Sequence, residues 1–307
     1  MTQMITAVGT SLPNQGGGAA ALDRALTRAA AAGADHAELS ATHLYITVGG
    51  RDNITRQEAL AKVCTRHSLT YTLHAPIAVN FMDTTHGDLH RAVLESSLYL
   101  AGRIGATVAV VHPGRVSPQA DLADRTRLLQ IERDQVRRTA DLAGKLGVRI
   151  GMENLNPNRD MMAGRLHSYA LEPAALAEQV AAIDHEAVCG VMDFGHGWLA
   201  AGRLGFDYLA QMRAFAPLVG HLHVTDNCGM PVTYPDANDD EHVAYGMGDL
   251  HLPIGWGTVP YGSLLADLPI RPGSVANIEI KGIHDAELEA SILATRAFAA
   301  RLNGANA

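Results

Sequence analysis

An apolar run ends on a carboxylate and an imidazole in the stretch Val191-Met192-Asp193-Phe194-Gly195-His196. A buried parallel strand is nearly all apolar, so a charged residue at its end marks the point where the strand leaves the core. Working outward, the same pattern recurs in Ala37-Glu38-Leu39, Leu73-His74-Ala75, Val110-Val111-His112-Pro113-Gly114, Ile150-Gly151-Met152-Glu153-Asn154, Leu222-His223-Val224-Thr225-Asp226 and Ile278-Glu279-Ile280. If these ends share one edge of a sheet, acids and imidazoles form a ring, as in metal sites.

The apolar runs alternate with stretches of helical periodicity. The sequence predicts strands over residues 4–8, 36–40, 69–74, 107–112, 148–153, 187–193, 219–225 and 276–280. It predicts helices over residues 19–32, 54–67, 88–104, 124–146, 173–183, 207–215, 259–265 and 285–302, with a long loop over 226–258. Eight strand–helix units in 307 residues predict an α/β fold, a (β/α)8 TIM barrel, as a single domain over residues 1–307. In such a barrel the C-terminal ends of the strands line the active site.

The alternative fold is an open doubly wound sheet. That fold normally carries a glycine-rich phosphate loop after its first strand. Gly16-Gly17-Gly18 lacks the required spacing and predicts only a turn. The sequence also lacks a P-loop, a GxSxG motif and paired CxxC motifs, so we favour the barrel.

Composition narrows the classes of function. The chain has 24 Lys and Arg against 32 Asp and Glu, and its net charge of -8 weighs against a general nucleic-acid binder. Cys64, Cys189 and Cys228 form no CxxC pair and indicate reduced thiols in the cytoplasm. The N-terminus lacks a secretion signal, and no apolar run approaches the ~18 residues of a membrane span. We therefore expect a cytoplasmic protein with no membrane and no nucleic-acid partner.

Three strand-ending acids predict a divalent cation. Glu153, Asp193 and Glu279 would repel one another strongly at one barrel mouth, and a cation relieves that repulsion. His223 offers a nitrogen ligand beside them. Carboxylates with one imidazole suit Mn²⁺, Mg²⁺ or Co²⁺, and further imidazoles shift the preference toward Zn²⁺ or Fe²⁺. Any one of these residues alone is more often a salt-bridge partner, so the prediction depends on their number and placement.

A second set of residues could hold one or two more ions. Its members follow the predicted strands or lie in the long loop, and they are His74, His112, His196, Asp249 and His251. The alternative is that these imidazoles form hydrogen bonds with substrate hydroxyls or phosphate.

Further residues are candidates for contact with a substrate. Trp198 and Trp256 fall in predicted loops after ligand-bearing strands, where they could form an apolar wall against a sugar ring or simply pack the loops. Glu38 is interpreted as structural. Candidates for holding substrate oxygens are Asn154, Asn227, Lys281 and Arg115.

The motifs, taken in order, resemble the xylose isomerase-like barrel superfamily across nearly the whole chain. That group contains sugar and sugar-phosphate isomerases and epimerases, inosose dehydratases and endonuclease IV. The matching motifs are Leu73-His74-Ala75-Pro76, His112-Pro113-Gly114, Gly151-Met152-Glu153-Asn154, Asp193-Phe194-Gly195-His196, His221-Leu222-His223-Val224, Asp249-Leu250-His251-Leu252-Pro253-Ile254-Gly255-Trp256-Gly257 and Ile278-Glu279.

The resemblance implies two different metal sites. The ketose 3-epimerases bind one metal through positions matched by Glu153, Asp193, His223 and Glu279, and their two glutamates act as acid and base on opposite faces of a carbon, through a metal-stabilised enediolate. Endonuclease IV binds three zinc ions through positions matched by His74, His112, Glu153, Asp193, His196, His223, Asp249, His251 and Glu279. The chain departs from endonuclease IV in lacking basic DNA-reading loops, since the loop after the second strand offers little beyond Arg51.

We therefore expect a divalent-metal-dependent isomerase or epimerase of a sugar, sugar phosphate or cyclitol. The alternative is a multinuclear metal lyase or phosphodiesterase, including cleavage of abasic DNA as by endonuclease IV. A third class, a barrel that binds without catalysis, conflicts with the complete ligand set. The expected cofactor is Mn, Zn, Co, Mg or Fe, one to three ions per chain. The oligomeric state stays open, with a homo-oligomer formed through the outer helices as one option.

Overall fold

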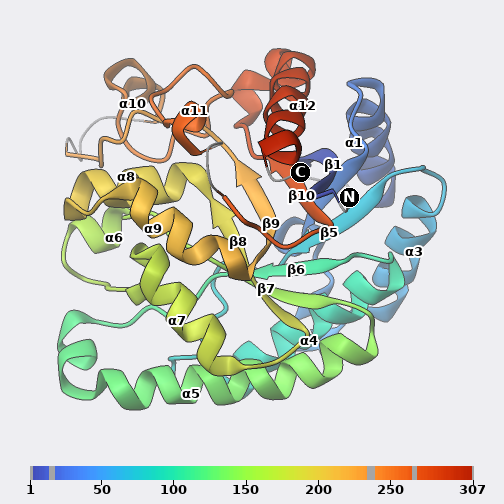
Figure 1. Ribbon diagram of the computed structural model, residues 1–307. Coiled ribbons are helices and arrows are strands. Elements are labelled where there is room, and N and C mark those ends of the chain that lie inside the picture. Colours follow the sequence, from blue (N-terminus) through green and yellow to red (C-terminus); the bar gives the residue numbers. More distant parts are fainter. Residues whose placement is uncertain (1–2, 14–17, 234–238, 265–267, 306–307) are drawn as a thin grey trace.

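Parallel strands close into a barrel in the order β1-β10-β9-β8-β7-β6-β5-β2, with helices around the outside (Figure 1). The computed structural model describes residues 3–13, 18–233, 239–264 and 268–305. The strands of the barrel are β1 (Ile5–Ser11), β2 (His36–Ser40), β5 (Thr70–His74), β6 (Val108–Val111), β7 (Arg149–Glu153), β8 (Val188–Asp193), β9 (Val219–Val224) and β10 (Ser274–Ile278). The predicted (β/α)8 barrel is confirmed.

Most of the helices connect one strand of the barrel to the next strand along the chain. They are α1 (Ala19–Ala31), α2 (Ala41–Leu44), α3 (Ile54–Cys64), α4 (Gly87–Arg103), α5 (Pro118–Lys145), α6 (Arg159–Met162), α7 (Pro173–Ile183), α8 (Phe194–Leu204), α9 (Tyr208–Phe215), α10 (Asp239–Tyr245), α11 (Tyr261–Leu264) and α12 (Leu288–Ala305). Among the described residues, none of these helices is both long and apolar enough to cross a membrane.

The structure differs from the predicted elements in several places, including three short helices that the sequence did not predict, α2, α6 and α10, the last within the predicted 226–258 loop. Asp193 ends β8 and caps the N-terminus of α8, a helix that the sequence did not predict, so Trp198 lies in a helix and not in a loop. Helix α5 begins at Pro118, and the predicted start at Asp124 is a kink within it. Strands β3 (Thr47–Val48) and β4 (Arg51–Asp52) form an unpredicted hairpin. Gly16, Gly17, part of the 226–258 loop and residue 265 lie outside the described residues.

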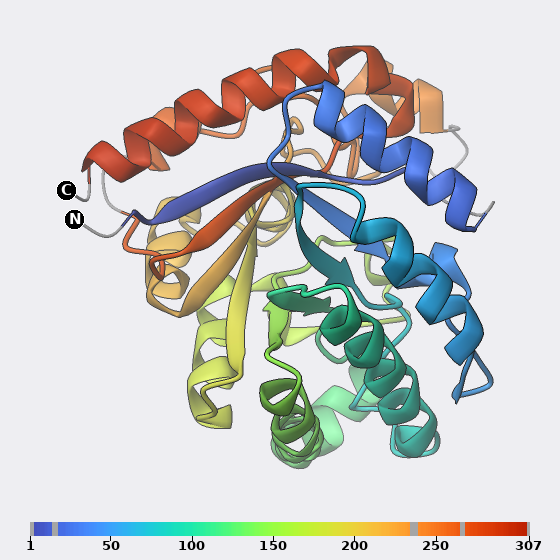
Figure 2. The ribbon, with the colours of Figure 1, turned by 90° about the vertical axis from the view of Figure 1, so that its right-hand side faces the viewer.

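The two ends of the fold are joined at the barrel wall. Strand β1 and helix α12 come from opposite ends of the sequence and lie side by side (Figure 2). The Asn303 side chain accepts a hydrogen bond from the Ile5 amide at 2.9 Å and donates one to the Ile5 carbonyl at 3.0 Å. On its other side β1 pairs in parallel with β10, and this pairing closes the barrel.

The inside of the barrel is divided into an apolar and a polar half. Val108, Val110, Cys189 and Val191 form a small buried cluster. Gly151 leaves room for them, because a Cβ there would lie 2.5 Å from Val191 and 2.7 Å from Val108. Buried polar residues on the other strands include His36, Glu38, Thr72, His221, His223 and Asn277.

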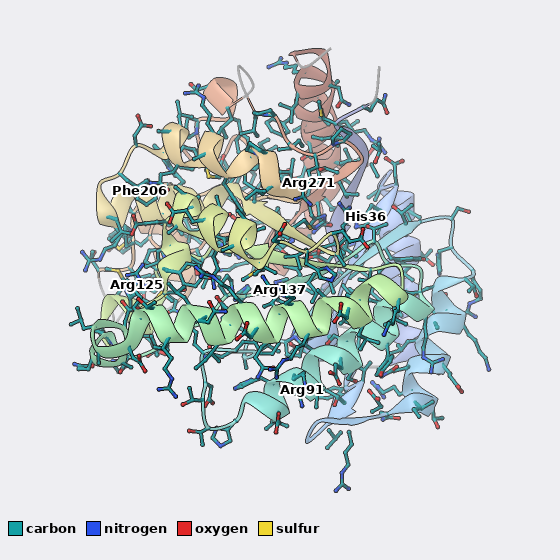
Figure 3. The ribbon with its side chains drawn as sticks, turned by 60° about the horizontal axis from the view of Figure 1, so that its bottom comes forward. His36, Arg91, Arg125, Arg137, Phe206 and Arg271 are labelled. Atoms are coloured by element: carbon teal, nitrogen blue, oxygen red, sulfur yellow. The ribbon has the colours of Figure 1, made fainter. Side chains whose placement is uncertain are left out.

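Helix α5 crosses the outside of the barrel and supports the loop after β6 (Figure 3). Arg137 donates to the Ile183 carbonyl at the end of α7. The buried Glu132 carboxylate accepts hydrogen bonds from the Gly114 amide at 2.6 Å, the Tyr169 hydroxyl at 2.5 Å and the Gln179 amide at 3.0 Å. Three donors converge on one carboxylate, so this helix fixes the position of the loop that follows His112.

Replacing Glu132 by glutamine should destabilise the fold. The glutamine side chain has one acceptor oxygen, so its NH2 group would face a donor that Glu132 now accepts from. We expect Glu132→Gln to lower the free energy of unfolding by about 1–3 kcal/mol in urea denaturation. Glu58→Gln on the exposed face of α3 is the matched control and should change it by less than about 0.5 kcal/mol. Equal stability of the two variants would contradict the assigned role.

Candidate metal centre

The C-terminal ends of four neighbouring strands bring the first predicted ligands together. Glu153 ends β7, Asp193 ends β8, His223 lies near the end of β9 and Glu279 directly follows β10. Asp193 and His223 are paired in register across β8 and β9. Parallel strands end at the same edge of a barrel, so these side chains share its mouth.

These four residues form the inner group, in which one ligand atom from each lies within 4.8 Å of the others. His223 Nδ1 is at their centre, 2.9 Å from Glu153 Oε1, 3.6 Å from Glu279 Oε2 and 3.9 Å from Asp193 Oδ2. The inner group is the set predicted for a single cation.

A first outer group forms around the other oxygen of Glu153. His74 Nε2 lies 3.4 Å and His112 Nε2 lies 3.2 Å from Glu153 Oε2. Glu153 therefore belongs to two ligand groups at once, with one oxygen turned to each.

A second outer group forms at the start of α8 and in the long loop. His251 Nε2 lies 2.8 Å and His196 Nε2 lies 3.4 Å from Asp249 Oδ2. His196 reaches this position because Asp193 accepts its backbone amide at 2.7 Å and begins the helix there. The structure thus brings all nine predicted ligands into three adjacent groups.

Backbone carbonyls fix the orientation of three of the imidazoles. His74 Nδ1 lies 2.8 Å from the Ala75 carbonyl, His196 Nδ1 lies 3.0 Å from that of Asn154, and His251 Nδ1 lies 2.8 Å from that of Glu279. A carbonyl only accepts, so in each ring Nδ1 donates and Nε2 presents its lone pair to its group when the ring is neutral. Metal-binding histidines are held in the same way.

Burial and crowding of charge shift the pKa values of the centre. Glu153, Asp193 and His223 are at most 1% exposed. Burial raises the pKa of Asp193 to about 7. Burial lowers the pKa of His74, but its contact with Glu153 outweighs this and raises it to about 9. Asp249 likewise outweighs burial and raises the pKa of His251 to about 9. Cations are thus favoured among these carboxylates.

Three orphaned oxygens show that the centre fits divalent cations. Glu153 Oε2, Asp193 Oδ2 and Asp249 Oδ1 are buried and accept no well-aligned hydrogen bond among the described residues, although His112 and His74 Nε2 lie 3.2 and 3.4 Å from Glu153 Oε2. A buried carboxylate oxygen without a partner is costly, and a bound cation satisfies it. Oxygen with imidazole ligands suits Mn²⁺, Mg²⁺, Co²⁺ and Zn²⁺.

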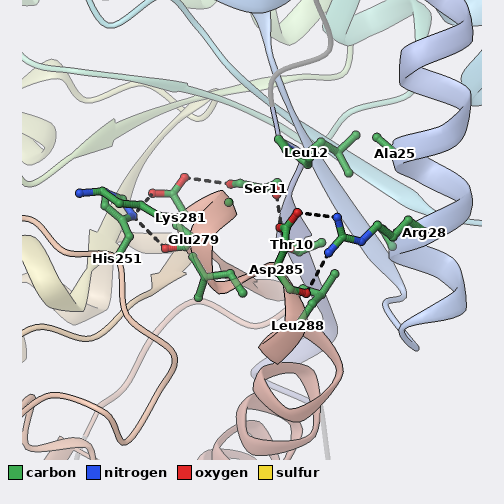
Figure 4. Close-up of a pocket in the computed structure, with 14 residues that line it drawn as sticks. Thr10, Ser11, Leu12, Ala25, Arg28, His251, Glu279, Lys281, Asp285 and Leu288 are labelled. Atoms are coloured by element: carbon green, nitrogen blue, oxygen red, sulfur yellow. Dashed lines mark hydrogen bonds and ion pairs between the residues drawn. The ribbon is translucent and has the colours of Figure 1, made fainter. Parts of the chain in front are cut away.

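Two cavities meet at the centre. One has a volume of about 310 Å³ and lies over Glu153, Glu279 and both outer groups, with Arg115 on its wall. The other has a volume of about 290 Å³ and lies between α1 and α12, with Ser11 and Lys281 on its wall (Figure 4). His251 and Glu279 border both cavities.

Four of the six residues predicted to contact a substrate lie in different surroundings. Lys281 lines the second cavity. The Asn154 side chain is buried and exchanges two hydrogen bonds, both 2.9 Å, with the Asp193 backbone. Trp198 packs on Tyr208 and donates to Thr258. Trp256 is 57% exposed and packs on His284. Neither tryptophan is among the described residues that line the two cavities.

Glu38 was predicted to be only structural, but it lies beside the inner group. Glu38 is 1% exposed and lies against His221 and His223, and these three form a further cluster of potential ligands. The signal was present in the alternation of His36 and Glu38, since residues two apart on a strand face the same side. The sequence could not show that this side is the inside of the barrel.

Comparison with known proteins agrees with this geometry. A search of curated proteins gives no match. A D-tagatose 3-epimerase-like protein has 20% sequence identity and a TM-score of 0.72, covering 98% of this chain and 100% of its own. A xylose isomerase-like TIM barrel protein from Mycobacterium smegmatis in complex with magnesium has 17% identity and a TM-score of 0.63, covering 100% and 98%. A protein from Thermus thermophilus soaked with ZnCl2 has 20% identity and a TM-score of 0.62, covering 97% and 98%.

These structures share the fold at low sequence identity, and the sequence itself supplies the assignment to a family. The family described as xylose isomerase-like TIM barrel matches residues 26–294, which include every ligand of the three groups. The chain therefore belongs to the xylose isomerase-like TIM barrel family.

Proposed function

We propose that the protein is a divalent-metal-dependent isomerase or epimerase of a sugar, sugar phosphate or cyclitol. One observation carries the proposal: Glu153 and Glu279 both belong to the inner group and both line the 310 Å³ cavity. Two carboxylates in one small cavity can act on the same substrate carbon.

The size and polarity of the cavity support a small polar substrate. A volume of about 310 Å³ lies at the lower end of ligand pockets. Its wall includes Arg115, Asn156 and Asn158, whose side chains are suited to hydroxyl or phosphate oxygens. The structural likeness to a D-tagatose 3-epimerase-like protein agrees with this class of substrate.

The inner group would hold the catalytic cation through Glu153, Asp193, His223 and Glu279. A divalent cation bound there supplies positive charge that stabilises negative charge developing on a substrate oxygen. The likenesses to a magnesium complex and to a zinc-soaked protein are compatible with either metal.

The two glutamates would move the proton. One carboxylate removes a proton from the carbon beside the substrate carbonyl, and the electron pair of that C–H bond passes toward the carbonyl oxygen. The other carboxylate, in its acid form, returns a proton to that carbon from the opposite face. Glu279 is held for this role, because its Oε1 accepts a hydrogen bond from the Ser11 hydroxyl at 2.9 Å.

The shared position of Glu153 favours a second candidate function, a multinuclear metal lyase or phosphodiesterase. If the first outer group also holds a cation, Glu153 bridges two ions with its two oxygens and has no oxygen left to take a proton. The two functions therefore exclude each other at this residue, and the number of bound ions separates them.

We predict that the protein binds about one ion per chain. Mn²⁺-loaded protein, freed of excess metal, should show this stoichiometry by elemental analysis, because Glu153 must keep one oxygen for proton transfer. Asp193→Asn should lose the ion, and His112→Asn, in the outer group, should retain it. Three ions per chain would favour the multinuclear function.

Proton exchange with solvent tests the assigned acid and base. In heavy water with Mn²⁺, we expect the wild-type protein to incorporate deuterium beside the carbonyl of at least one member of a panel of ketoses and inososes. Glu153→Gln and Glu279→Gln should each slow the exchange at least about 100-fold. Glu172→Gln, an exposed glutamate at the start of α7, is the control and should exchange like the wild type. Retained exchange in either site variant refutes the two-carboxylate assignment.

A nicking assay tests the second function directly. Under the proposed function, a duplex containing one abasic site stays intact when incubated with protein loaded with Zn²⁺ or Mn²⁺. Metal-dependent strand cleavage at that site, lost in Glu153→Gln and absent on an undamaged duplex, would establish the phosphodiesterase.

A further inference from the structure

Glu38 sits beneath the inner group, inside the barrel. Its carboxylate lies on β2 and accepts hydrogen bonds from Thr72 Oγ1 at 2.9 Å and His221 Nε2 at 3.0 Å. Strands β1 and β10 separate β2 from β9, so the bond to His221 crosses the barrel interior. With an exposed fraction of 1%, this carboxylate has no access to solvent that would explain its presence.

The same carboxylate holds one ligand of the inner group. His223 Nε2 lies 3.1 Å from Glu38 Oε1 and 3.3 Å from Glu38 Oε2. Carboxylates only accept, and His223 Nδ1 also lies 2.9 Å from Glu153 Oε1, so both ring nitrogens carry hydrogen while no cation is bound. A cation on Nδ1 would replace the hydrogen there, and Nε2 would keep the hydrogen that Glu38 accepts. Nδ1 is the atom that faces Glu153, Asp193 and Glu279.

Glu38 reaches a second ligand through Ser11. The Ser11 hydroxyl lies 2.9 Å from Glu279 Oε1 (Figure 4) and 3.1 Å from Glu38 Oε1, and its one hydrogen goes to the nearer carboxylate, Glu279. Asn277 donates to the same hydroxyl oxygen at 2.8 Å, which fixes Ser11 between the two carboxylates. Glu279 is thereby held by Oε1, and its Oε2 turns to His223.

We propose that Glu38 is a positioning residue, which accepts the hydrogen of His223 Nε2 and packs against the Ser11 hydroxyl that holds Glu279, and so sets the affinity of the inner group for a divalent cation. The inference rests on the inner group holding a cation, as in the proposed function, and is independent of the reaction. Carboxylates that hold a metal-binding histidine by its second nitrogen have this effect in other metal sites.

A cation held by Glu38 itself is the competing assignment, because Glu38, His221 and His223 have ligand atoms within 4.8 Å of one another. Two observations count against it. Both oxygens of Glu38 already face donors, Oε1 the His223 Nε2 and Oε2 the Thr72 hydroxyl and His221 Nε2, and none of the cavities at the barrel mouth is lined by Glu38 or His221 among the described residues. An anomalous scattering peak between Glu38 and His221 in Mn²⁺-soaked crystals would overturn the proposal.

The test compares Glu38→Gln with Thr72→Val by Mn²⁺ titration calorimetry. Glu38→Gln keeps the shape of the side chain and removes its charge, and should weaken Mn²⁺ binding about 10–100-fold. Thr72→Val removes one donor to Glu38 but keeps the carboxylate that faces His223 Nε2, and should change the affinity less than about 2-fold. Unfolding temperatures of the metal-free variants separate affinity from stability. If the two variants lose affinity in proportion to stability, Glu38 is merely structural and the proposal fails.

A spectroscopic readout reports on His223 directly. In the Zn²⁺-loaded protein labelled with ¹⁵N-histidine, we expect the His223 ring to carry its hydrogen on Nε2, and Glu38→Gln to shift the Nε2 resonance and broaden it. An unchanged His223 signal with unchanged affinity overturns the proposal.

Two further outcomes are distinguishable. If the wild type binds no Mn²⁺, the proposed function fails together with this inference; if the wild type and folded Glu38→Gln bind equally, only this inference fails. Should Glu38→Gln not fold, Ser11→Ala carries the test. It breaks the link to Glu279 alone, and it should weaken Mn²⁺ binding measurably, with wild-type affinity overturning the proposal.

Discussion

The burial of several carboxylates at one end of a closed barrel is the constraint on which the rest of the site depends. Glu38, Glu153 and Asp193 are each at most 1% exposed. An isolated buried carboxylate is strongly disfavoured, so each must be balanced by a hydrogen-bond donor, a histidine or a cation. Glu38 is balanced by protein donors, whereas Glu153 and Asp193 each keep an orphaned oxygen. That difference separates the residue that supports the site from the residues that would bind metal.

Glu153 decides which chemistry the site can perform. Its two oxygens face two different ligand groups, at 2.9 Å from His223 and 3.2 Å from His112. With one cation in the inner group it keeps an oxygen for proton transfer; with a second cation it becomes a bridging ligand. Under the proposed function the same nine side chains would serve either proton transfer or multinuclear hydrolysis, and the relative affinity of the three groups for cations would decide between them. This is why the ligand set alone, in sequence or in structure, leaves the reaction open.

The sequence predicted the barrel and the meeting of its nine ligands, because strands with period two and a shared direction place their terminal residues at one edge. It did not predict α8, because Gly195 and Gly197 lower helix propensity at its start and the helix depends on capping by Asp193. It assigned Glu38 no role in the site, since mid-strand residues face inward or outward according to a register that only the closed barrel fixes. Trp198 and Trp256 were predicted to contact a substrate because they follow ligand-bearing strands in the sequence. In the structure Trp198 packs on Tyr208 instead.

The polar half of the barrel interior is also explained by the need to balance buried carboxylates. Filling it with apolar side chains, as Val108, Val110 and Val191 fill the other half, would remove the need to bury Glu38, and such replacements of buried charges are often neutral or stabilising. Apolar packing, however, cannot accept the hydrogen of His223 Nε2, whereas the Glu38 carboxylate can. The buried charge of Glu38 on β2 therefore contributes little to stability, but it holds His223 on β9 in place. Its position inside the barrel is best explained by the inner group above it.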